Sequence, residues 1–174
     1  MSLLTSAATK AIIALGSNLG NSRQIILDAM ARLQDSSCEP ILKSSLWQTS
    51  PVDCPPGSSV FVNAIIGLVP RPDETPESLL VKLQSLEKEF GRQAKKSLNE
   101  PRPLDLDLIA FGDVTRQSPK LILPHPRAHL RRFVLQPLSE IAPDLVLPGQ
   151  TKTVLDLLCD LPEGETVDWL SSPI

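Results

Sequence analysis

PRPLDLDLIAF, residues 101–111, alternates two carboxylates with large apolar side chains. In a β-strand, residues two apart point to the same face. We therefore expect Asp105 and Asp107 to project side by side, while the leucines beside them face a core. Adjacent carboxylates disfavour each other's ionisation unless a cation lies between them. Mg²⁺ suits such a pair, because it often takes one or two carboxylates and completes its octahedron with water and substrate phosphates.

Two arginines accompany this strand. Arg102 lies just before it, and Arg92 lies one loop earlier. Guanidinium groups bind phosphate through paired hydrogen bonds, so carboxylates for metal together with arginines for phosphate indicate a site for a nucleoside triphosphate. The alternative is an exposed strand face that happens to carry two aspartates. The apolar character of the strand and the nearby Arg102 favour the site.

The composition is that of an ordinary globular domain. With 174 residues, 41% of them hydrophobic and 21% charged, the chain can form one domain with a real core. A net charge of −3 argues against a surface that holds nucleic acid. The chain has no apolar run of membrane-spanning length, no signal-peptide pattern at its start, and no zinc or disulfide spacing among its three cysteines. We expect a cytoplasmic protein, by default monomeric.

Hydrophobic periodicity predicts an α+β fold in a single domain, residues 1–174. Strands are expected over 11–15, 41–48, 60–69 and 104–111, and helices over 22–34 and 76–90. This β-α-β-β-α-β order is ferredoxin-like. A short strand near 121–123 and helices near 130–138 and 154–161 follow, while residues 1–9 and 163–174 are expected to form a flexible extension and a tail.

Other segments each allow two interpretations. Gly16–Gly20, GSNLG, permits a close backbone approach, but it lacks the lysine of a phosphate loop and is more simply a turn. Phe61 and Asn63 could stack on and pair with a planar heterocycle, or they could be a core ring beside a turn-capping amide. Glu87 could bind a ribose hydroxyl or pair with a nearby basic side chain.

A basic run follows the sequence LPHP. Arg127, His129, Arg131 and Arg132 lie within six residues, just after His125. These groups could bind phosphates, or they could form the solvated face of a helix, an alternative that is strongest for Arg127 and His129.

In this order, GSNLGN, FVN, PRPLDLDLIAFG and LPHPRAHLRRFVLQPLSEIAPD resemble the segments of 6-hydroxymethyl-7,8-dihydropterin pyrophosphokinases, a family of folate synthesis. The resemblance runs from about residue 10 to residue 160. It implies a three-layer α-β-α domain with a mainly antiparallel sheet, built on the ferredoxin-like core. It also implies transfer of the diphosphate of ATP to the hydroxymethyl group of the pterin, with AMP as the other product.

The resemblance further implies roles for individual residues. Asp105 and Asp107 would hold two Mg²⁺ ions, Arg92 and Arg102 would act on the transferred phosphates, and the loop 91–101 would close over ATP. The implied ATP contacts are Gln84, Glu87, Arg92, Arg102, Leu108, Lys120, Leu121, Ile122, His125 and Arg131. The implied pterin contacts are Thr49, Pro51, Val52, Phe61, Asn63, Asp105 and Phe133.

The chain departs from the family pattern at four positions. Ala94 and Asn99 stand where many members carry an arginine and a tryptophan. Glu100 replaces a glycine, and Pro126 replaces an aromatic residue after the histidine. Three of these changes lie in the loop 91–101, so we expect them to affect loop closure and ATP affinity more than the chemistry.

Two other classes share the β-α-β-β-α-β order. An RNA-recognition module would need exposed aromatic residues and a basic face, whereas this chain has no tyrosine, 3% aromatic residues and a negative net charge. A small-molecule regulatory domain would have no use for paired aspartates. Formation of AMP rather than ADP would distinguish the pyrophosphokinase from both.

Overall fold

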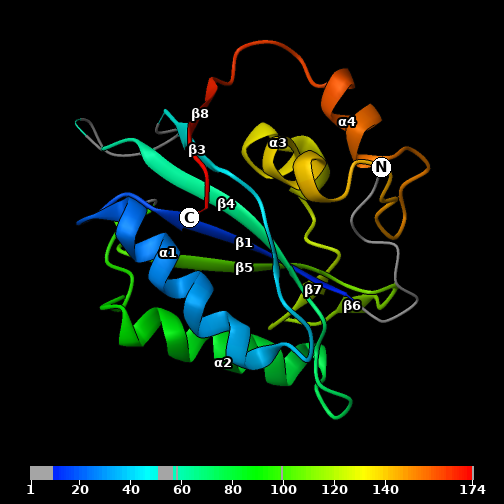
Figure 1. Cartoon of the computed structure of the whole chain (residues 1–174), viewed down its shortest axis with the longest axis horizontal. Coiled ribbons are helices and arrows are strands. Elements are labelled where there is room, and N and C mark those ends of the chain that lie inside the picture. The colour runs from blue at the N-terminus through cyan, green and yellow to red at the C-terminus, as the bar shows by residue number, and fades with distance from the viewer. Residues whose placement is uncertain (1–9, 51–56, 58, 99, 174) are drawn as a thin grey trace.

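The computed structural model describes residues 10–50, 57, 59–98 and 100–173, so the expected extension over 1–9 lies outside them. Its main sheet is antiparallel and centres on β1 (Ala11–Ser17). β1 pairs with β4 (Phe61–Leu68) on one side and with β5 (Asp105–Phe111) on the other. Three strands that are far apart in the sequence therefore lie next to one another at the centre of the molecule (Figure 1).

The remaining strands extend the sheet beyond β4. β2 (Leu42–Lys43) and β3 (Leu46–Thr49) both pair with β4, and β8 (Val167–Ser171) pairs with β3. The order β5-β1-β4-β3-β8 contains the ferredoxin-like arrangement, in which the fourth and third core strands flank the first. The predicted α+β class with an antiparallel sheet is confirmed.

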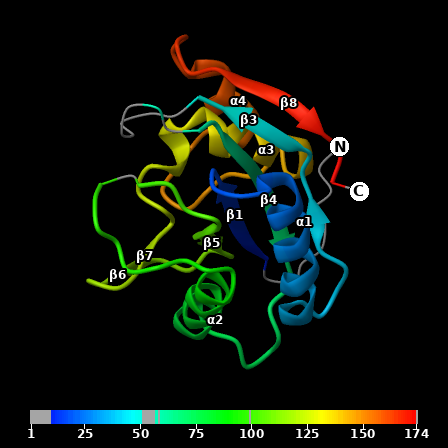
Figure 2. The same ribbon diagram turned by 90° about the vertical axis from the view of Figure 1, so that its left-hand side faces the viewer.

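Helices cover both faces of this sheet, which gives three layers (Figures 1 and 2). α1 (Ser22–Leu33) and α2 (Pro76–Glu89) pack on one face, where α1 contacts β1 and β4 and α2 contacts β5. α3 (Arg132–Ile141) packs on the other face against β3 and β4, and α4 (Val154–Asp160) packs against α3.

Local sequence explains where most of these helices begin. The side chain of Asn21 accepts a hydrogen bond from the amide of Gln24 at the start of α1. At the start of α2, Thr75 and Ser78 form a reciprocal capping box, and Pro76 occupies the first helical position. At the start of α4, the side chain of Thr153 accepts a hydrogen bond from the amide of Asp156. α3 differs, because its N-cap residue provides no side-chain hydrogen bond.

The two faces of the sheet bury separate apolar cores. Leu104, Leu106 and Leu108 lie in the core beneath α1 and α2, as the alternating pattern predicts. A register shift in the β1–β5 pairing follows Leu108, so that Ile109 and Ala110 both lie in the core beneath α3. The irregularity turns the end of β5 while leaving both aspartates on the face opposite the leucines.

Three segments differ from the expected pattern. The strand predicted over 41–48 is two strands, because Ser44 is buried and its hydroxyl oxygen accepts the amide of Ile65, 2.9 Å away. The helix predicted over 130–138 runs from Arg132 to Ile141 after a 3₁₀ turn, Ala128–Leu130. Part of the expected tail, Val167–Ser171, is strand β8.

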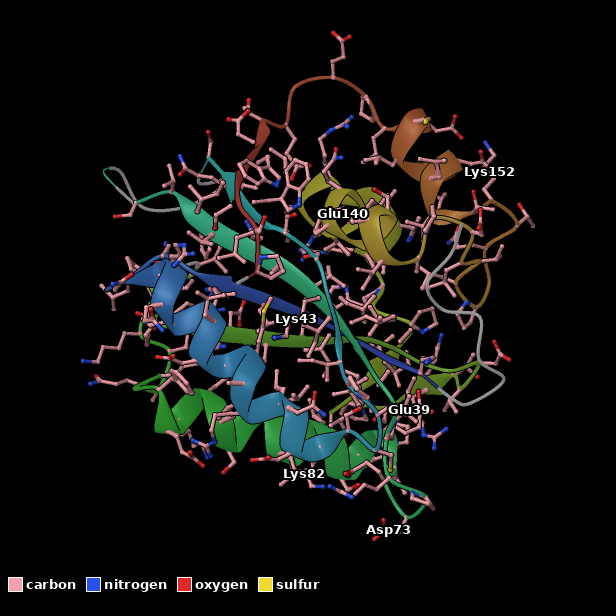
Figure 3. All side chains as sticks on the ribbon, in the orientation of Figure 1. Glu39, Lys43, Asp73, Lys82, Glu140 and Lys152 are labelled. Carbon is pink, nitrogen blue, oxygen red and sulfur yellow. The ribbon has the colours of Figure 1, made fainter. Side chains whose placement is uncertain are left out.

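The remaining elements are small. β6 (Arg116–Gln117) and β7 (Ile122–Leu123) form a separate two-stranded sheet, and Gln34–Ser36 is a 3₁₀ turn. In Figure 3, Lys82 lies at the outer surface of α2, whereas Glu140 lies between α3 and β3, where it accepts a hydrogen bond from Trp47. Within the described ranges, no helix is long and apolar enough to cross a membrane.

Candidate active site

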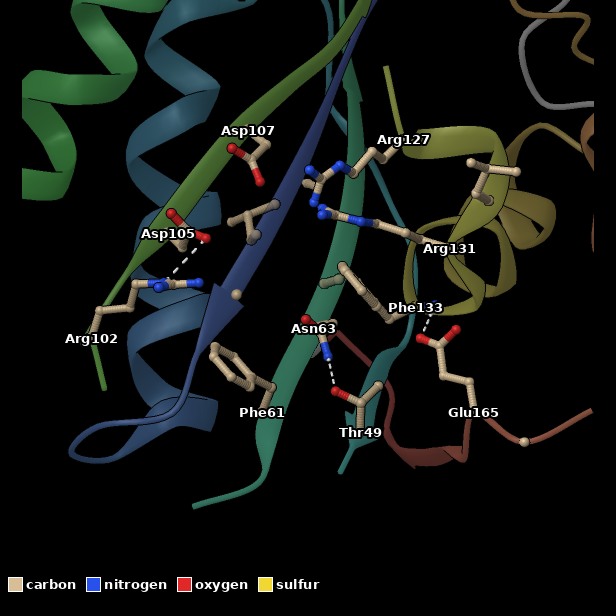
Figure 4. Close-up of a pocket in the computed structure, with 16 residues that line it drawn as sticks. Thr49, Phe61, Asn63, Arg102, Asp105, Asp107, Arg127, Arg131, Phe133 and Glu165 are labelled. Carbon is tan, nitrogen blue, oxygen red and sulfur yellow. Dashed lines mark hydrogen bonds and ion pairs between the residues drawn. The ribbon is translucent and has the colours of Figure 1, made fainter. Parts of the chain in front are cut away.

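A cavity of about 630 Å³ lies between the sheet and the start of α3 (Figure 4). The three central strands supply its floor, the region around α3 supplies one wall, and the segment just before β8 closes one end. Its lining residues are Ala14, Leu15, Gly16, Thr49, Phe61, Asn63, Ala64, Arg102, Asp105, Asp107, Arg127, Leu130, Arg131, Phe133, Gly164 and Glu165.

Two phenylalanine–arginine pairs face this cavity from different elements. The guanidinium carbon of Arg102 lies 5.5 Å from the centre of the Phe61 ring, and that of Arg131 lies 5.3 Å from the centre of the Phe133 ring. At these distances each cation is attracted to the face of its ring. Each pair therefore places an apolar plane directly beside a positive charge.

The polar group that β4 contributes to the floor is the amide of Asn63. Its side-chain nitrogen donates a hydrogen bond to the hydroxyl of Thr49, 2.9 Å away, and the residue is 6% exposed. Gly16 pairs with Asn63 in β4 and with Asp105 in β5. A Cβ atom at Gly16 would lie 3.4 Å from the side-chain oxygen of Asn63. Glycine therefore keeps the floor open between the amide and the carboxylates.

The paired aspartates lie on one face of β5, as predicted. Asp105 forms ion pairs with Arg92 and with Arg102, the latter at 3.2 Å. Burial and the neighbouring charge of Asp105 raise the pKa of Asp107 from 3.8 to about 6, against the opposing effect of the nearby arginines. The pair thus carries negative charge that a cation would stabilise.

This donor set fits Mg²⁺ in chemistry and number. Among the described residues, no three His, Cys, Asp or Glu side chains form a group that could hold a metal. Proteins nevertheless commonly supply only one or two carboxylate ligands to a Mg²⁺ ion, and phosphate oxygens and water supply the others. Any such ion would therefore depend on a bound phosphate compound.

A second cavity, of about 340 Å³, lies along the loop that follows α2. Arg92, Lys95, Lys96 and Glu100 line it, and Arg102 lines both cavities. Burial lowers the pKa of Arg92, but Asp105 and Glu87 outweigh burial and hold the pKa above its usual value. The loop predicted to close over ATP therefore brings cations to one side of the paired aspartates.

The turn after β1 holds Arg102 in place. The backbone amide of Arg102 donates to the side-chain oxygen of Asn18 at 2.9 Å, and the amide of Asn18 donates to the carbonyl oxygen of Arg102 at 3.2 Å. Asn18 is 3% exposed. The sequence GSNLG is therefore more than a strand–helix turn, because it fixes the backbone of an arginine that reaches both cavities.

Nine of the sequence-predicted residues come together at the cavities. Thr49, Phe61, Asn63, Arg102, Asp105, Asp107, Arg131 and Phe133 line the larger cavity, and Arg92 lines the smaller one. Pro51 and Val52 lie outside the described residues, as does Asn99. The candidates that line neither cavity are Gln84, Glu87, Leu108, Lys120, Leu121, Ile122 and His125.

Glu87 supports the strand and the loop rather than facing a cavity. Its Oε1 atom accepts hydrogen bonds from the amide of Leu106 at 2.7 Å and from Nη1 of Arg92 at 2.8 Å. Burial raises the pKa of Glu87 to about 7, although both of these interactions oppose the rise. Of the alternatives for this residue, the structure supports pairing with Arg92.

His125 and Arg127 lie beside Arg131. Burial lowers the pKa of His125, and the charges of Arg131 and Arg127 lower it further. Nδ1 of His125 accepts the backbone amide of Arg127 at 3.2 Å. In Figure 4 the guanidinium groups of Arg127 and Arg131 point together toward the strand that carries Asp107. Such like charges at close range favour an anion between them and the strand.

Some lining residues were not among the predicted ATP or pterin contacts. Arg127 lay in the basic run, and only its position in space distinguishes it from a solvated side chain. Gly16 lay in a motif interpreted as a turn, although a strand glycine can mark a close approach of ligand. Gly164 and Glu165 lay in no recognised pattern.

Two phenylalanines and an amide, next to paired carboxylates and arginines on a ferredoxin-like sheet, are the groups expected in an enzyme that acts on a planar ring and a phosphate compound. The sequence model of 7,8-dihydro-6-hydroxymethylpterin-pyrophosphokinase (HPPK) matches residues 12–143. The chain belongs to this family of pyrophosphokinases of folate synthesis.

Curated relatives agree with this assignment. The chain is 36% identical over 148 residues to 2-amino-4-hydroxy-6-hydroxymethyldihydropteridine pyrophosphokinase of Synechocystis sp., covering 85% of this chain and 74% of that one. It is 39% identical over 139 residues to the Pseudomonas aeruginosa protein of the same name, covering 78% and 82%. It is 40% identical over 139 residues to folic acid synthesis protein fol1 of Pneumocystis carinii, covering 78% of this chain but only 18% of that protein.

Solved structures support the fold. Wild-type HPPK-DHPS of Plasmodium falciparum aligns with a TM-score of 0.65 at 15% identity, over 90% of this chain and 42% of that chain. At this identity the likeness concerns the fold alone. The chain thus spans most of the bacterial relatives and less than half of this Plasmodium protein.

Proposed function

We propose that this chain transfers the β,γ-diphosphate of ATP to the hydroxymethyl oxygen of 6-hydroxymethyl-7,8-dihydropterin and releases AMP. One observation carries the proposal: two phenylalanines, the amide of Asn63, the paired aspartates and three arginines line a single cavity. A substrate with an aromatic ring and a short hydroxymethyl arm would place its ring beside the phenylalanines and present its oxygen to the aspartates.

Phe61, Phe133 and Asn63 form the site for the pterin in this proposal. The ring would lie between the two phenylalanines, which contribute stacking and apolar burial. The side chain of Asn63 would pair with the polar edge of the ring, and its hydrogen bond to Thr49 fixes which way the amide points. Pro51 and Val52 stay predictions from the family resemblance.

Arg92 and Arg102 would bind the phosphate chain. Both guanidinium groups pair with Asp105, which would hold them next to the transferred phosphates. Arg102 also lies where the two cavities meet, so ATP could extend from the loop side toward the pterin. Charge-assisted hydrogen bonds from both residues would stabilise the charge that develops on the leaving AMP.

Asp105 and Asp107 would hold Mg²⁺. When bound with ATP, the metal would supply neutralisation of the phosphate charge and polarisation of the hydroxyl group. The protein would contribute two carboxylates on one face of β5. Arg131 and Arg127, opposite these carboxylates, would bind the remaining phosphate oxygens.

The adenine would lie along the outer edge of β5. Leu108 buries its side chain in the core, so a contact with adenine would use its backbone. In an antiparallel strand alternate residues direct their amides to the same side. The amide of Leu106 points outward to Glu87, and that of Leu108 therefore points to the same edge. Leu121, Ile122 and Lys120 lie in or just before β7, which contacts β5.

The experiment follows both products of the reaction. The protein is incubated with ATP, Mg²⁺ and 6-hydroxymethyl-7,8-dihydropterin, and nucleotides and pterins are separated by chromatography. We expect equal amounts of AMP and pterin diphosphate, with none formed when the pterin or Mg²⁺ is omitted. Formation of ADP, or binding of both ligands without AMP formation, would refute the proposal. The monomeric state and cytoplasmic location remain predictions.

A further inference from the structure

The start of α3 is stabilised by a residue far away in the sequence. A helix begins with amides that have no partner inside the helix, and Arg131, at the N-cap of α3, supplies no side-chain acceptor. The carboxylate of Glu165 takes this role. Its Oε2 atom accepts the amide of Arg132 at 2.9 Å. Its Oε1 atom accepts the amide of Phe133 at 3.2 Å (Figure 4).

The same helix start carries two side chains of the cavity. Arg131 and Phe133 both line it, and the guanidinium of Arg131 lies over the Phe133 ring. Glu165 lines the cavity as well. One carboxylate therefore holds the backbone from which the aromatic wall projects, and its negative charge is favourable at a helix N-terminus.

Glu165 is itself held by the sheet. Strand β8 begins two residues later, at Val167, which pairs with Thr49 in β3. Thr49 accepts the hydrogen bond that orients Asn63. The segment before β8 thus connects to the Phe133 wall through Glu165 and to the floor through Thr49. This segment lies beyond residue 143, where the match to the family ends.

We propose that Glu165 is a positioning residue that sets the affinity for the pterin by fixing the backbone of Phe133. The inference rests on the proposed function, because the aromatic wall must be the pterin site. Without the carboxylate, the first turn of α3 would fray and the ring would lose its fixed orientation. Substrate binding would then have to order that turn.

The test measures ligand affinity in four proteins: wild type, Glu165→Ala, Glu165→Gln and Glu163→Gln. Glu163 is exposed in the same segment and serves as the control, because its substitution changes the net charge equally. Calorimetric titration uses 6-hydroxymethyl-7,8-dihydropterin with Mg²⁺ and a non-hydrolysable ATP analogue. We expect Glu165→Ala to weaken pterin binding about three- to tenfold, the range expected for a lost helix cap.

The glutamine variant distinguishes an effect on pterin affinity from a general loss of protein stability. Glutamine keeps one acceptor oxygen, so its pterin affinity should lie between those of wild type and Glu165→Ala, and the control should match wild type. The affinity for the ATP analogue alone should fall less than the pterin affinity in Glu165→Ala, because the carboxylate binds the amides of Arg132 and Phe133 and not that of Arg131. A lowered melting temperature with unchanged pterin affinity in Glu165→Gln and Glu165→Ala would overturn the proposal.

A double-mutant cycle tests the route through Phe133. If Glu165 acts by holding this ring, Glu165→Ala should change pterin affinity less than about twofold in a Phe133→Ala background. Additive effects would show that Glu165 acts independently and would overturn the proposal. A wild-type protein that does not bind the pterin would refute the proposed function, whereas normal wild-type turnover with unaffected Glu165 variants would refute only this inference.

Discussion

The Asp107→Asn substitution removes one of two adjacent carboxylates and keeps the shape of the side chain. Asp107 lies beside Asp105 on β5, and burial and this neighbour raise its pKa to about 6. The charged form is therefore less favourable in the folded protein than in the unfolded chain. We expect the asparagine variant to be more stable than wild type without metal, and to lose catalysis.

The expected gain in stability of Asp107→Asn follows from the raised pKa of Asp107. A rise from 3.8 to about 6 corresponds to about 3 kcal/mol, and solvent in the open cavity reduces the expected gain to about 1–3 kcal/mol at pH 7.5. The size of this cost depends on pH: a raised carboxyl pKa costs nothing below about pH 3, where the carboxyl is protonated in both states. The cost develops between the unfolded pKa of 3.8 and the folded pKa of about 6, and it is complete above that range. The difference between the two proteins should therefore vanish at about pH 3.

Urea unfolding in EDTA measures this difference. At pH 7.5 the midpoint of Asp107→Asn should lie about 1 M above that of wild type. With Mg²⁺, ATP and pterin, its rate of AMP formation should fall about 10³-fold or more, because several kcal/mol of charge stabilisation are lost. Asp113→Asn is the control, since Asp113 is exposed just after β5. A less stable Asp107→Asn protein, or one with wild-type turnover, would contradict the reasoning.

Three further substitutions test other parts of the site. Arg92→Ala should lower kcat about 10³-fold and change the KM for ATP much less in steady-state assays, if its guanidinium acts on the transferred phosphates as proposed. An effect confined to KM would make Arg92 a binding residue. Gly16→Ala adds a methyl group 3.4 Å from the side-chain oxygen of Asn63, so the KM for the pterin should rise about tenfold. The circular dichroism spectrum should show that the variant still folds. An unchanged KM would mean that the pterin binds elsewhere. Glu87→Gln keeps an acceptor for the amide of Leu106 and removes a carboxyl whose pKa is raised to about 7. In urea unfolding, the free energy of unfolding of this variant should therefore rise by about 1–2 kcal/mol relative to that of wild type between pH 5 and pH 8. A difference that stays constant with pH would refute this.

Local patterns were enough to predict the core of the fold. The helices predicted over 22–34 and 76–90 and the strand predicted over 11–15 all appear where the sequence indicates them. β8 was not predicted, because its short sequence VDWLS has no distinctive pattern and its partner β3 lies more than 100 residues earlier. Such a pairing depends on non-local contacts that periodicity does not report.

The chemistry of the site was predictable where the reacting groups lie close together in the sequence. Asp105 and Asp107 owe their shared direction to strand alternation alone, and Phe61 and Asn63 follow the same rule in β4, on the other side of β1. Glu165 reaches the cavity only because β8 joins the sheet beside β3, so its role depends on the fold as a whole.

At Leu108, strand alternation determines the direction of both the side chain and the backbone amide. The alternation that directs Asp107 into the cavity buries the side chain of Leu108 in the opposite core, so this residue cannot offer its side chain to a nucleotide there. The same alternation directs its amide to the outer edge of the strand, next to the amide that Glu87 binds. Leu108 thus remains a candidate ATP contact through its backbone amide. Side-chain substitutions at Leu108 should therefore affect stability more than ATP affinity.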